Sequence, residues 1–161
     1  DKWFRTGDLM RRDARDYCYF VDRIGDTFRW KAENVSTGEV AEALTVLDGV
    51  DQANVYGVEV PGYDGRAGMA SLVTHENIDP DLLYAHLRNS LPHYARPVFL
   101  RITQETEITT TFKYKKTNLV KQGYDPDKVP DDLYISDPQT ETYIPLDKAI
   151  FQKIQKGEIK F

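Results

Sequence analysis

Short strand-like segments alternate with helix-start signals along this chain of 161 residues, and the alternation limits the folds that it can adopt. Ser36 and Glu39 form a capping box, which predicts a helix because the serine hydroxyl can accept the N–H three residues later. Asp79 followed by Pro80 predicts the start of another helix. Strand-like runs rich in β-branched and apolar residues lie at 50–60, 67–74, 98–103, 133–135 and 142–144. We therefore expect an α+β or small α/β fold, a short sheet with about three helices, and take α+β as the prediction.

The N-terminal residues predict a β-hairpin. Aromatic and β-branched residues fill 3–11 and 17–22, and the polar stretch 12–16 between them suits a turn. An isolated hairpin is only marginally stable in water, so we expect this one to lean on another domain. Cys18 lies among the aromatic residues of the hairpin, and the expectation for it is a buried, inert thiol.

Composition argues against several classes of function. The net charge of −5 argues against nucleic acid as a partner, although a few cations can still bind phosphate. No run approaches the ~18 apolar residues that a membrane-spanning helix needs. The single cysteine excludes an internal disulfide and fits a reducing compartment. The three histidines show no metal-ligand spacing, so no metal site is expected.

Three segments could bind a nucleotide. Thr6-Gly7-Asp8 sets a carboxylate beside a glycine, which suits bonding to ribose hydroxyls. Asp22-Arg23, followed by Gly25-Asp26, could contact a phosphate or ribose and supply a swivel. Residues 109–116 combine threonine hydroxyls with three lysines, as a phosphate-binding patch would. Each segment alone has a plainer explanation: a bulged strand, a surface ion pair or a solvated charged face.

In their order and spacing, these segments resemble the adenylate-forming superfamily, which includes acyl-CoA synthetases, luciferase-like enzymes and the adenylation domains of peptide synthetases. The aromatic-x-Thr-Gly-Asp strand, the Asp-Arg pair with its hinge and the Leu-Pro-x-Tyr-x-x-Pro segment stand at 4–8, 22–26 and 91–97. The lysine motif of the superfamily stands at 109–113. The sequence of residues 25–37 is similar to the sequences of the branch of fatty-acid transport proteins and very-long-chain acyl-CoA synthetases.

The resemblance implies a two-part chain. Residues 1–25 would be the last β-hairpin of a large N-terminal domain plus a hinge, and residues 26–161 the small C-terminal domain of the acyl-CoA synthetase fold. The full-length enzyme would activate long or very long fatty acids with ATP and Mg²⁺ through an acyl-adenylate, and would transfer the acyl group to coenzyme A. Its own N-terminal domain would be its partner, so this fragment alone is expected to be inactive. The implied location is cytoplasmic, with peripheral membrane contact of the full-length protein.

The resemblance also implies a role for individual residues. Lys113 would be catalytic, between the attacking carboxylate and the α-phosphate, while Asp8 and Arg23 would bind the ATP or AMP. Gly25 would be the hinge, with Asp26 as the alternative. The coenzyme A channel would be shaped by three residues of one loop: Lys31, Ala32 and Asn34.

Two positions depart from the pattern of the superfamily, and two alternative functions stay open. Ala32 and Thr110 stand where glycine is usual, and a methyl group at a channel wall could narrow the channel. The first alternative is an adenylation domain that loads a carrier protein. The second is an α+β interaction module that keeps the fold without the activity.

Overall fold

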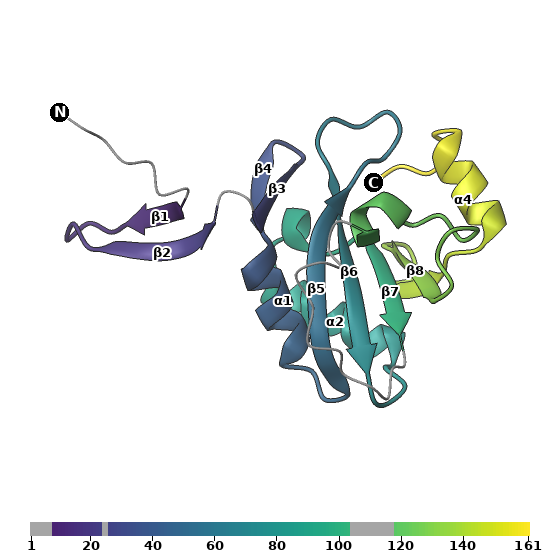
Figure 1. Ribbon diagram of the computed structural model, residues 1–161, viewed down its shortest axis with the longest axis horizontal. Coiled ribbons are helices and arrows are strands. Elements are labelled where there is room, and N and C mark those ends of the chain that lie inside the picture. The colour runs from purple at the N-terminus through teal and green to yellow at the C-terminus, as the bar shows by residue number, and fades with distance from the viewer. Residues whose placement is uncertain (1–7, 24–25, 104–117) are drawn as a thin grey trace.

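The computed structural model describes residues 8–23, 26–103 and 118–161. Most of them build one five-stranded sheet with the order β5-β6-β7-β8-β9 (Figure 1). Its strands are β5 (Val50–Val58), β6 (Ala67–Thr74), β7 (Phe99–Thr103), β8 (Asp132–Asp137) and β9 (Thr142–Pro145). Neighbouring strands are antiparallel except β6 and β7, which run parallel because a helix crosses between them. The α+β fold expected from the sequence is confirmed.

The longer described helices begin where the sequence supplies a side-chain cap. α1 (Thr37–Thr45) begins after Ser36, whose hydroxyl accepts a hydrogen bond from the N–H of Glu39 at 3.2 Å. α2 (Pro80–Ser90) and α4 (Lys148–Gln155) begin after Asp79 and Asp147, whose carboxylates accept N–H groups of the first turn. Two shorter helical pieces are η2 (His93–Ala95) and residues 118–122. The caps predicted at Ser36 and Asp79 are therefore confirmed.

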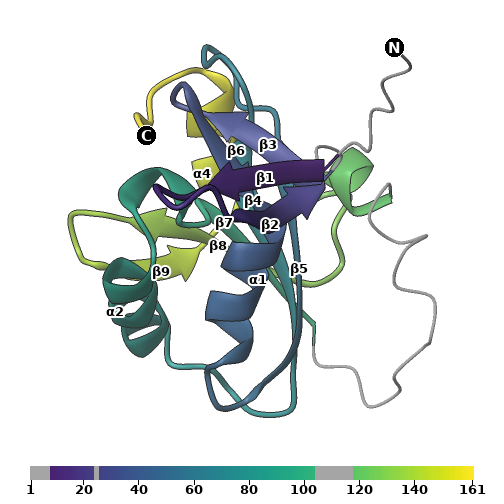
Figure 2. The same ribbon diagram turned by 90° about the vertical axis from the view of Figure 1, so that its left-hand side faces the viewer.

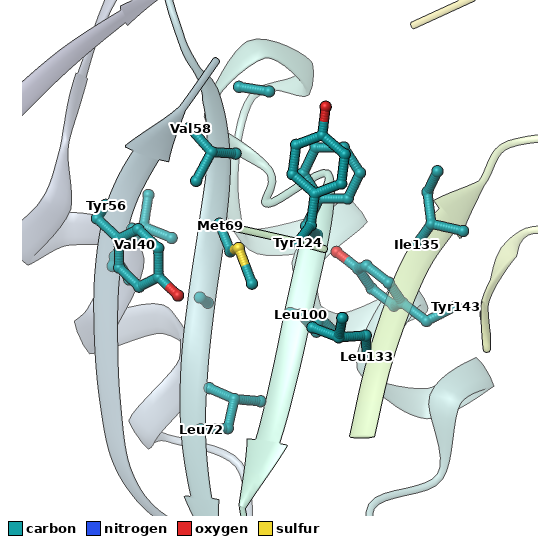
Figure 3. Close-up of a cluster of buried hydrophobic side chains, with 14 of the residues drawn as sticks. Val40, Tyr56, Val58, Met69, Leu72, Leu100, Tyr124, Leu133, Ile135 and Tyr143 are labelled. Carbon is teal, nitrogen blue, oxygen red and sulfur yellow. The ribbon is translucent and has the colours of Figure 1, made fainter. Parts of the chain in front are cut away.

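One part of the core lies between the sheet and the helices α1 and α2, which contact each other while α1 packs on β5 and α2 on β9 (Figure 2). Another part contains Phe99, whose ring stacks on Tyr124 at 4.1 Å, and Tyr124 in turn contacts Phe151 of α4 (Figure 3). Val40 and Leu44 of α1, and Leu83 and Leu87 of α2, are each at most 1% exposed. Burial of an aliphatic side chain of this size contributes about 1.5–3 kcal/mol. These side chains therefore form the buried faces of the two helices.

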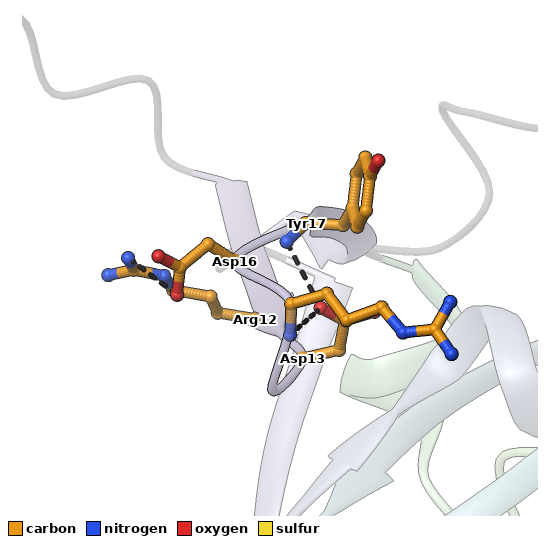
Figure 4. Close-up of polar contacts among 5 residues, drawn as sticks. Arg12, Asp13, Asp16 and Tyr17 are labelled. Carbon is orange, nitrogen blue, oxygen red and sulfur yellow. Dashed lines mark hydrogen bonds and ion pairs between the residues drawn. The ribbon is translucent and has the colours of Figure 1, made fainter.

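The strands β1 (Asp8–Arg12) and β2 (Cys18–Arg23) form the expected antiparallel hairpin, which Figure 1 shows to one side of the five-stranded sheet. Asp13 holds its turn, because one carboxylate oxygen accepts the N–H groups of Arg15 at 2.8 Å and Tyr17 at 3.1 Å (Figure 4). An exposed ion pair between Arg12 and Asp16 at 2.8 Å closes the same turn.

The expectation of a buried thiol in this hairpin is wrong. Cys18 is exposed, and so are the neighbouring Tyr17 and Tyr19. The physical reason is that a two-stranded ribbon has no second layer of its own to cover its side chains.

A second hairpin, of β3 (Thr27–Trp30) and β4 (Glu33–Ser36), packs on the sheet through Phe28. Gly57 of β5 and Gly68 of β6 are register partners beneath that ring. A Cβ added at Gly57 would lie 2.8 Å from the Cβ of Phe28, and one at Gly68 would lie 3.2 Å from its Cζ. The adjacent glycines thus make a bare patch on the sheet, and this patch fixes where the hairpin sits.

No helix within the described ranges is long and apolar enough to cross a membrane.

The loop between β5 and β6 contains two glycines of almost equal φ, +81° at Gly62 and +84° at Gly65. A Cβ at Gly62 would meet nothing within 4 Å, whereas one at Gly65 would lie 2.2 Å from the carbonyl oxygen of Arg29. The close approach lets the N–H of Arg66 donate to that same carbonyl at 2.7 Å. Gly65 therefore joins the loop to the β3–β4 hairpin.

We expect Gly62→Ala to lower the free energy of unfolding by about 1–2 kcal/mol, the cost of a left-handed backbone for alanine. Gly65→Ala should cost about 2–5 kcal/mol, because about 1–3 kcal/mol of overpacking adds to the same backbone cost. Urea denaturation of the two variants measures the difference directly. Equal losses would show that the contact with Arg29 carries no steric constraint.

Candidate functional site

The turn between β3 and β4 contains Lys31 and Ala32, both in the left-handed region with φ of 49° and 67°. Two consecutive positive φ values are what a two-residue type I′ turn requires, and the register from Trp30 to Glu33 leaves only these two residues in the loop. This conformation is unfavourable for both lysine and alanine, because their Cβ atoms crowd the backbone. The backbone at Ala32 thus adopts a conformation that suits glycine, the residue that the resemblance leads one to expect.

Packing on both sides of this turn holds it in place. Trp30 is only 2% exposed, and its ring lies 5.3 Å from that of Tyr63 between centroids. The carbonyl of Arg29 accepts the N–H of Arg66 at 2.7 Å. The strain of the turn is therefore sustained by its surroundings, an arrangement that is common at ligand-binding sites.

The structure brings the three predicted coenzyme A channel residues together on this hairpin. Lys31, Ala32 and Asn34 are all exposed, and the ammonium of Lys31 lies 6.0 Å from the ring centroid of Trp30. Their side chains are thus available to a ligand that reaches the turn.

Asp8 and Arg23, predicted to bind the nucleotide, are register partners in the β1–β2 hairpin. The backbone therefore sets these two positions directly opposite each other, and Asp8 is half-buried. The proposed hinge Gly25 and the proposed catalytic Lys113 lie outside the described residues, as does Thr110. Their placement remains a prediction.

Asp26, the alternative hinge residue, borders a cavity of about 400 Å³ between the β3–β4 hairpin and β5. Arg29 and Arg66 also line this cavity, so cationic and anionic groups meet there. Val120, just after the lysine segment, contributes another part of the wall. The cavity thus brings the hinge side of the chain next to the end of the segment that contains the lysine motif.

A buried polar cluster, which sequence reasoning missed, joins described residues on either side of 104–117. Arg101 on β7 is 9% exposed; its Nη1 donates to Gln122 Oε1 at 2.6 Å, and its Nε donates to the carboxylate of Asp131. Charge-assisted bonds of this kind are strong when both partners are desolvated. The only signal in the sequence was an arginine in the middle of an apolar strand, Phe-Leu-Arg-Ile-Thr.

The hydroxyl of Tyr56 lies near this cluster, buried and without a hydrogen-bond partner among the described residues. Burial raises the pKa of Tyr56 far above its usual range, while the positive charge of Arg101 opposes the shift. Tyr56 is therefore a neutral phenol that supplies packing at this position. No cluster of three potential metal ligands occurs within the described part of the chain.

Two comparisons with known proteins point to the same group of enzymes. Residues 39–113 match the sequence model of the AMP-binding enzyme C-terminal domain family. Long-chain fatty acid transport protein 6 of Mus musculus is 50% identical over 162 aligned residues, which cover 99% of this chain and 26% of that protein. The chain contains the C-terminal domain of the AMP-binding enzymes. It spans about a quarter of the length of the curated relatives that it matches.

Solved structures show the same fold in adenylate-forming enzymes. The o-succinylbenzoate CoA synthetase of Bacillus subtilis, in complex with its acyl-adenylate intermediate, is 28% identical with a TM-score of 0.59, covering 65% of this chain and 22% of that one. A structure of that enzyme with ATP and magnesium ion is 29% identical with a TM-score of 0.57, covering 63% of this chain and 21% of that one. The match to the AMP-binding family ends at residue 113, so β8, β9 and α4 lie beyond it.

We expect Ala32→Gly to raise the free energy of unfolding by about 0.5–1 kcal/mol. Relief of the left-handed penalty, about 1–2 kcal/mol, exceeds the extra entropy that glycine loses on folding, about 0.5–1 kcal/mol. Ala41→Gly, in the middle of α1, is the matched control and should lower stability by about 1 kcal/mol. Urea denaturation of both variants tests the sign, and a loss of stability in Ala32→Gly would contradict the strained-turn interpretation.

Proposed function

We propose that this chain is the C-terminal part of a fatty acyl-CoA synthetase. The full-length enzyme would activate long or very long chain fatty acids with ATP, form an acyl-adenylate and pass the acyl group to coenzyme A. The observation that carries this proposal is the 50% identity with a long-chain fatty acid transport protein across 99% of the chain. The order of the sequence motifs supports the same reading.

In the first half-reaction, the fatty carboxylate attacks the α-phosphorus of ATP, and pyrophosphate leaves. Lys113 would place its ammonium between the carboxylate and the α-phosphate, where it stabilises the charge that develops in the transition state. Asp8 would bind the ribose hydroxyls, and Arg23, opposite it in the hairpin, would contact the ribose or phosphate. Mg²⁺ would enter with the phosphates of ATP.

The buried Arg101 cluster supports this role of Lys113. Arg101 joins β7, which leads into residues 104–117, to Gln122, which follows them. Asp131 holds the same guanidinium from a third position in the chain. The cluster therefore holds together two described positions on either side of the segment that contains Lys113.

The second half-reaction would use the β3–β4 hairpin. Coenzyme A displaces AMP, and rotation of residues 26–161 about Gly25 or Asp26 would bring Lys31, Ala32 and Asn34 to the channel. Their exposure on one hairpin agrees with that role.

Residues 1–25 would belong to the large N-terminal domain together with the hinge. The exposed Tyr17 and Tyr19 support this division, because aromatic side chains of that size are usually covered in a complete structure. We place the full-length enzyme in the cytoplasm or on a membrane surface, a proposal that rests on the fatty acid transport proteins among its relatives.

In the full-length enzyme, Lys113→Ala should slow fatty-acid-dependent pyrophosphate exchange by about 10²–10³-fold, the effect of removing one donor to a developing charge. Thioester formation from a preformed acyl-adenylate should continue at nearly the normal rate. Lys115→Ala and Lys116→Ala are the matched controls, and both should retain exchange. If Lys113→Ala keeps both half-reactions, Lys113 is not the catalytic residue.

Changing the acyl acceptor distinguishes an acyl-CoA synthetase from an adenylation domain that loads a carrier protein. The proposal expects transfer to coenzyme A and none to a carrier protein, and the reverse result would make this an adenylation domain. Absence of acyl-adenylate formation by the full-length protein would favour a non-catalytic interaction module. The 161-residue chain alone should show no synthetase turnover, and measurable turnover would refute the requirement for the N-terminal domain.

A further inference from the structure

A cavity of about 940 Å³ lies at the end of the sheet where β7 begins and β8 ends. The β3–β4 turn, α2 and residues 93–98 contribute to its walls, together with β8, β9, α4 and residues 158–161. Figure 1 shows the tip of the β3–β4 hairpin and the last residue at the same end of the molecule. The volume is at the upper end of the range of small-ligand pockets, about 300–1,000 Å³.

Aliphatic side chains from several elements make up much of the lining. They are Leu87, Val98, Ile135, Ile144, Ile150 and Ile159. Transfer of a hydrocarbon chain from water to such a surface is favourable by about 25 cal/mol per Å² of apolar area. The lining therefore suits a ligand with a flexible apolar body better than it suits a polar nucleotide.

Cationic groups border the same cavity. Lys31, His93 and Arg96 come from the β3–β4 turn and the segment that contains η2. Burial, followed by the positive charges of Lys31 and Arg96, lowers the pKa of His93, so these three groups act on one another. Lys153 and Lys160 add positive charge from α4 and the end of the chain.

These cations have no acidic partner in the described ranges, where none of the five forms an ion pair. Arg96 donates to two backbone carbonyls, those of Leu91 at 2.9 Å and Arg88 at 3.1 Å. Those bonds fix the guanidinium without neutralising its charge.

Two acids, Asp137 and Glu158, also line the cavity, but they do not cancel its positive charge. The carboxylate of Asp137 accepts the hydroxyl of Thr140 at 2.8 Å and the N–H of Gln139 at 2.9 Å. These bonds engage Asp137 in the β8–β9 turn. Four permanent cations therefore face two carboxylates, and the excess charge favours an anion.

We propose that this cavity binds an amphipathic anion, a long aliphatic chain that ends in a carboxylate or phosphate. The aliphatic lining takes the chain, and the cationic border takes the head group. Much of the cavity is built by β8, β9 and α4, which lie beyond the residues that match the AMP-binding family. The proposal does not rest on the chemistry proposed for Lys113, although it shares Lys31 with the proposed coenzyme A channel. Its test does not require enzyme activity.

Calorimetric titration of the 161-residue chain with palmitate and with hexadecyl phosphate, below their micelle concentrations, tests the proposal. We expect one site per chain for at least one of them, and their relative affinities identify the head group. Hexadecanol, which has the same chain without the charge, should bind at least 10-fold more weakly. Proton NMR should show a raised pKa of His93 in the complex, because an anion stabilises the imidazolium.

Two pairs of variants locate the ligand. Ile150→Glu sets a negative charge in the lining and should weaken binding at least 10-fold, while Ala149→Glu, on the exposed side of the same helix turn, should not. Lys31→Gln should weaken binding of the anions but not of hexadecanol, and Lys156→Gln is its exposed control outside the cavity. Lys31 lies on an exposed turn, so this second pair remains informative if Ile150→Glu does not fold.

Several results would overturn the proposal: no saturable binding, several equivalent sites per chain, or equal binding by both members of each pair. If hexadecanol binds as tightly as palmitate and hexadecyl phosphate, the cavity does not recognise an anionic head group. Inorganic phosphate or coenzyme A that competes fully with palmitate at similar concentration would make the cavity a site for polar anions instead.

Discussion

The packing of Phe28 over two glycines positions the β3–β4 hairpin, which contains the proposed coenzyme A channel residues. Gly57 and Gly68 lie side by side on β5 and β6, and a Cβ at either one would collide with or crowd the aromatic ring. Full burial of a phenylalanine contributes about 1.5–3 kcal/mol, and this one is 8% exposed. The bare patch therefore decides where the β3–β4 hairpin sits, and the hairpin in turn contributes walls to both cavities.

The docked hairpin can hold a turn that its own sequence does not favour. A type I′ turn prefers Asn-Gly, and this chain has Lys31-Ala32. The backbone bond from Arg66 to Arg29 and the Trp30–Tyr63 contact supply the stabilisation that the turn residues lack. The unfavourable turn residue Lys31 adds a positive charge at the border of the larger cavity, whereas glycine or asparagine at that position would add none.

Features set by neighbouring residues could be predicted from the sequence, and features set by tertiary contact could not. The caps of α1 and α2 depend on Ser36 and Asp79 and on the N–H groups that follow them, so their signal is local. The exposure of Cys18 depends on which surface covers the hairpin, and an alternating pattern of residues does not specify that surface. The partners of Arg101 lie 21 and 30 residues away from it in the sequence, so no short motif predicts the cluster. The predicted channel residues lie on one hairpin because they are neighbours in the sequence. The cavity beside them is formed by segments far apart in the sequence, so only the folded structure reveals it.

The residues after 113 are integral to the domain that the AMP-binding family model matches. Strand β8 pairs with β7, so β7 lies inside the sheet and has no free edge. The hydroxyl of Tyr143 on β9 donates to the carbonyl of Pro97 at 2.7 Å and holds the segment that leads into β7. Both partners of Arg101, Gln122 and Asp131, also come from this later part of the chain. Because a buried arginine without its partners costs about 3–5 kcal/mol, loss of Gln122 and Asp131 with this later part of the chain would also destabilise β7.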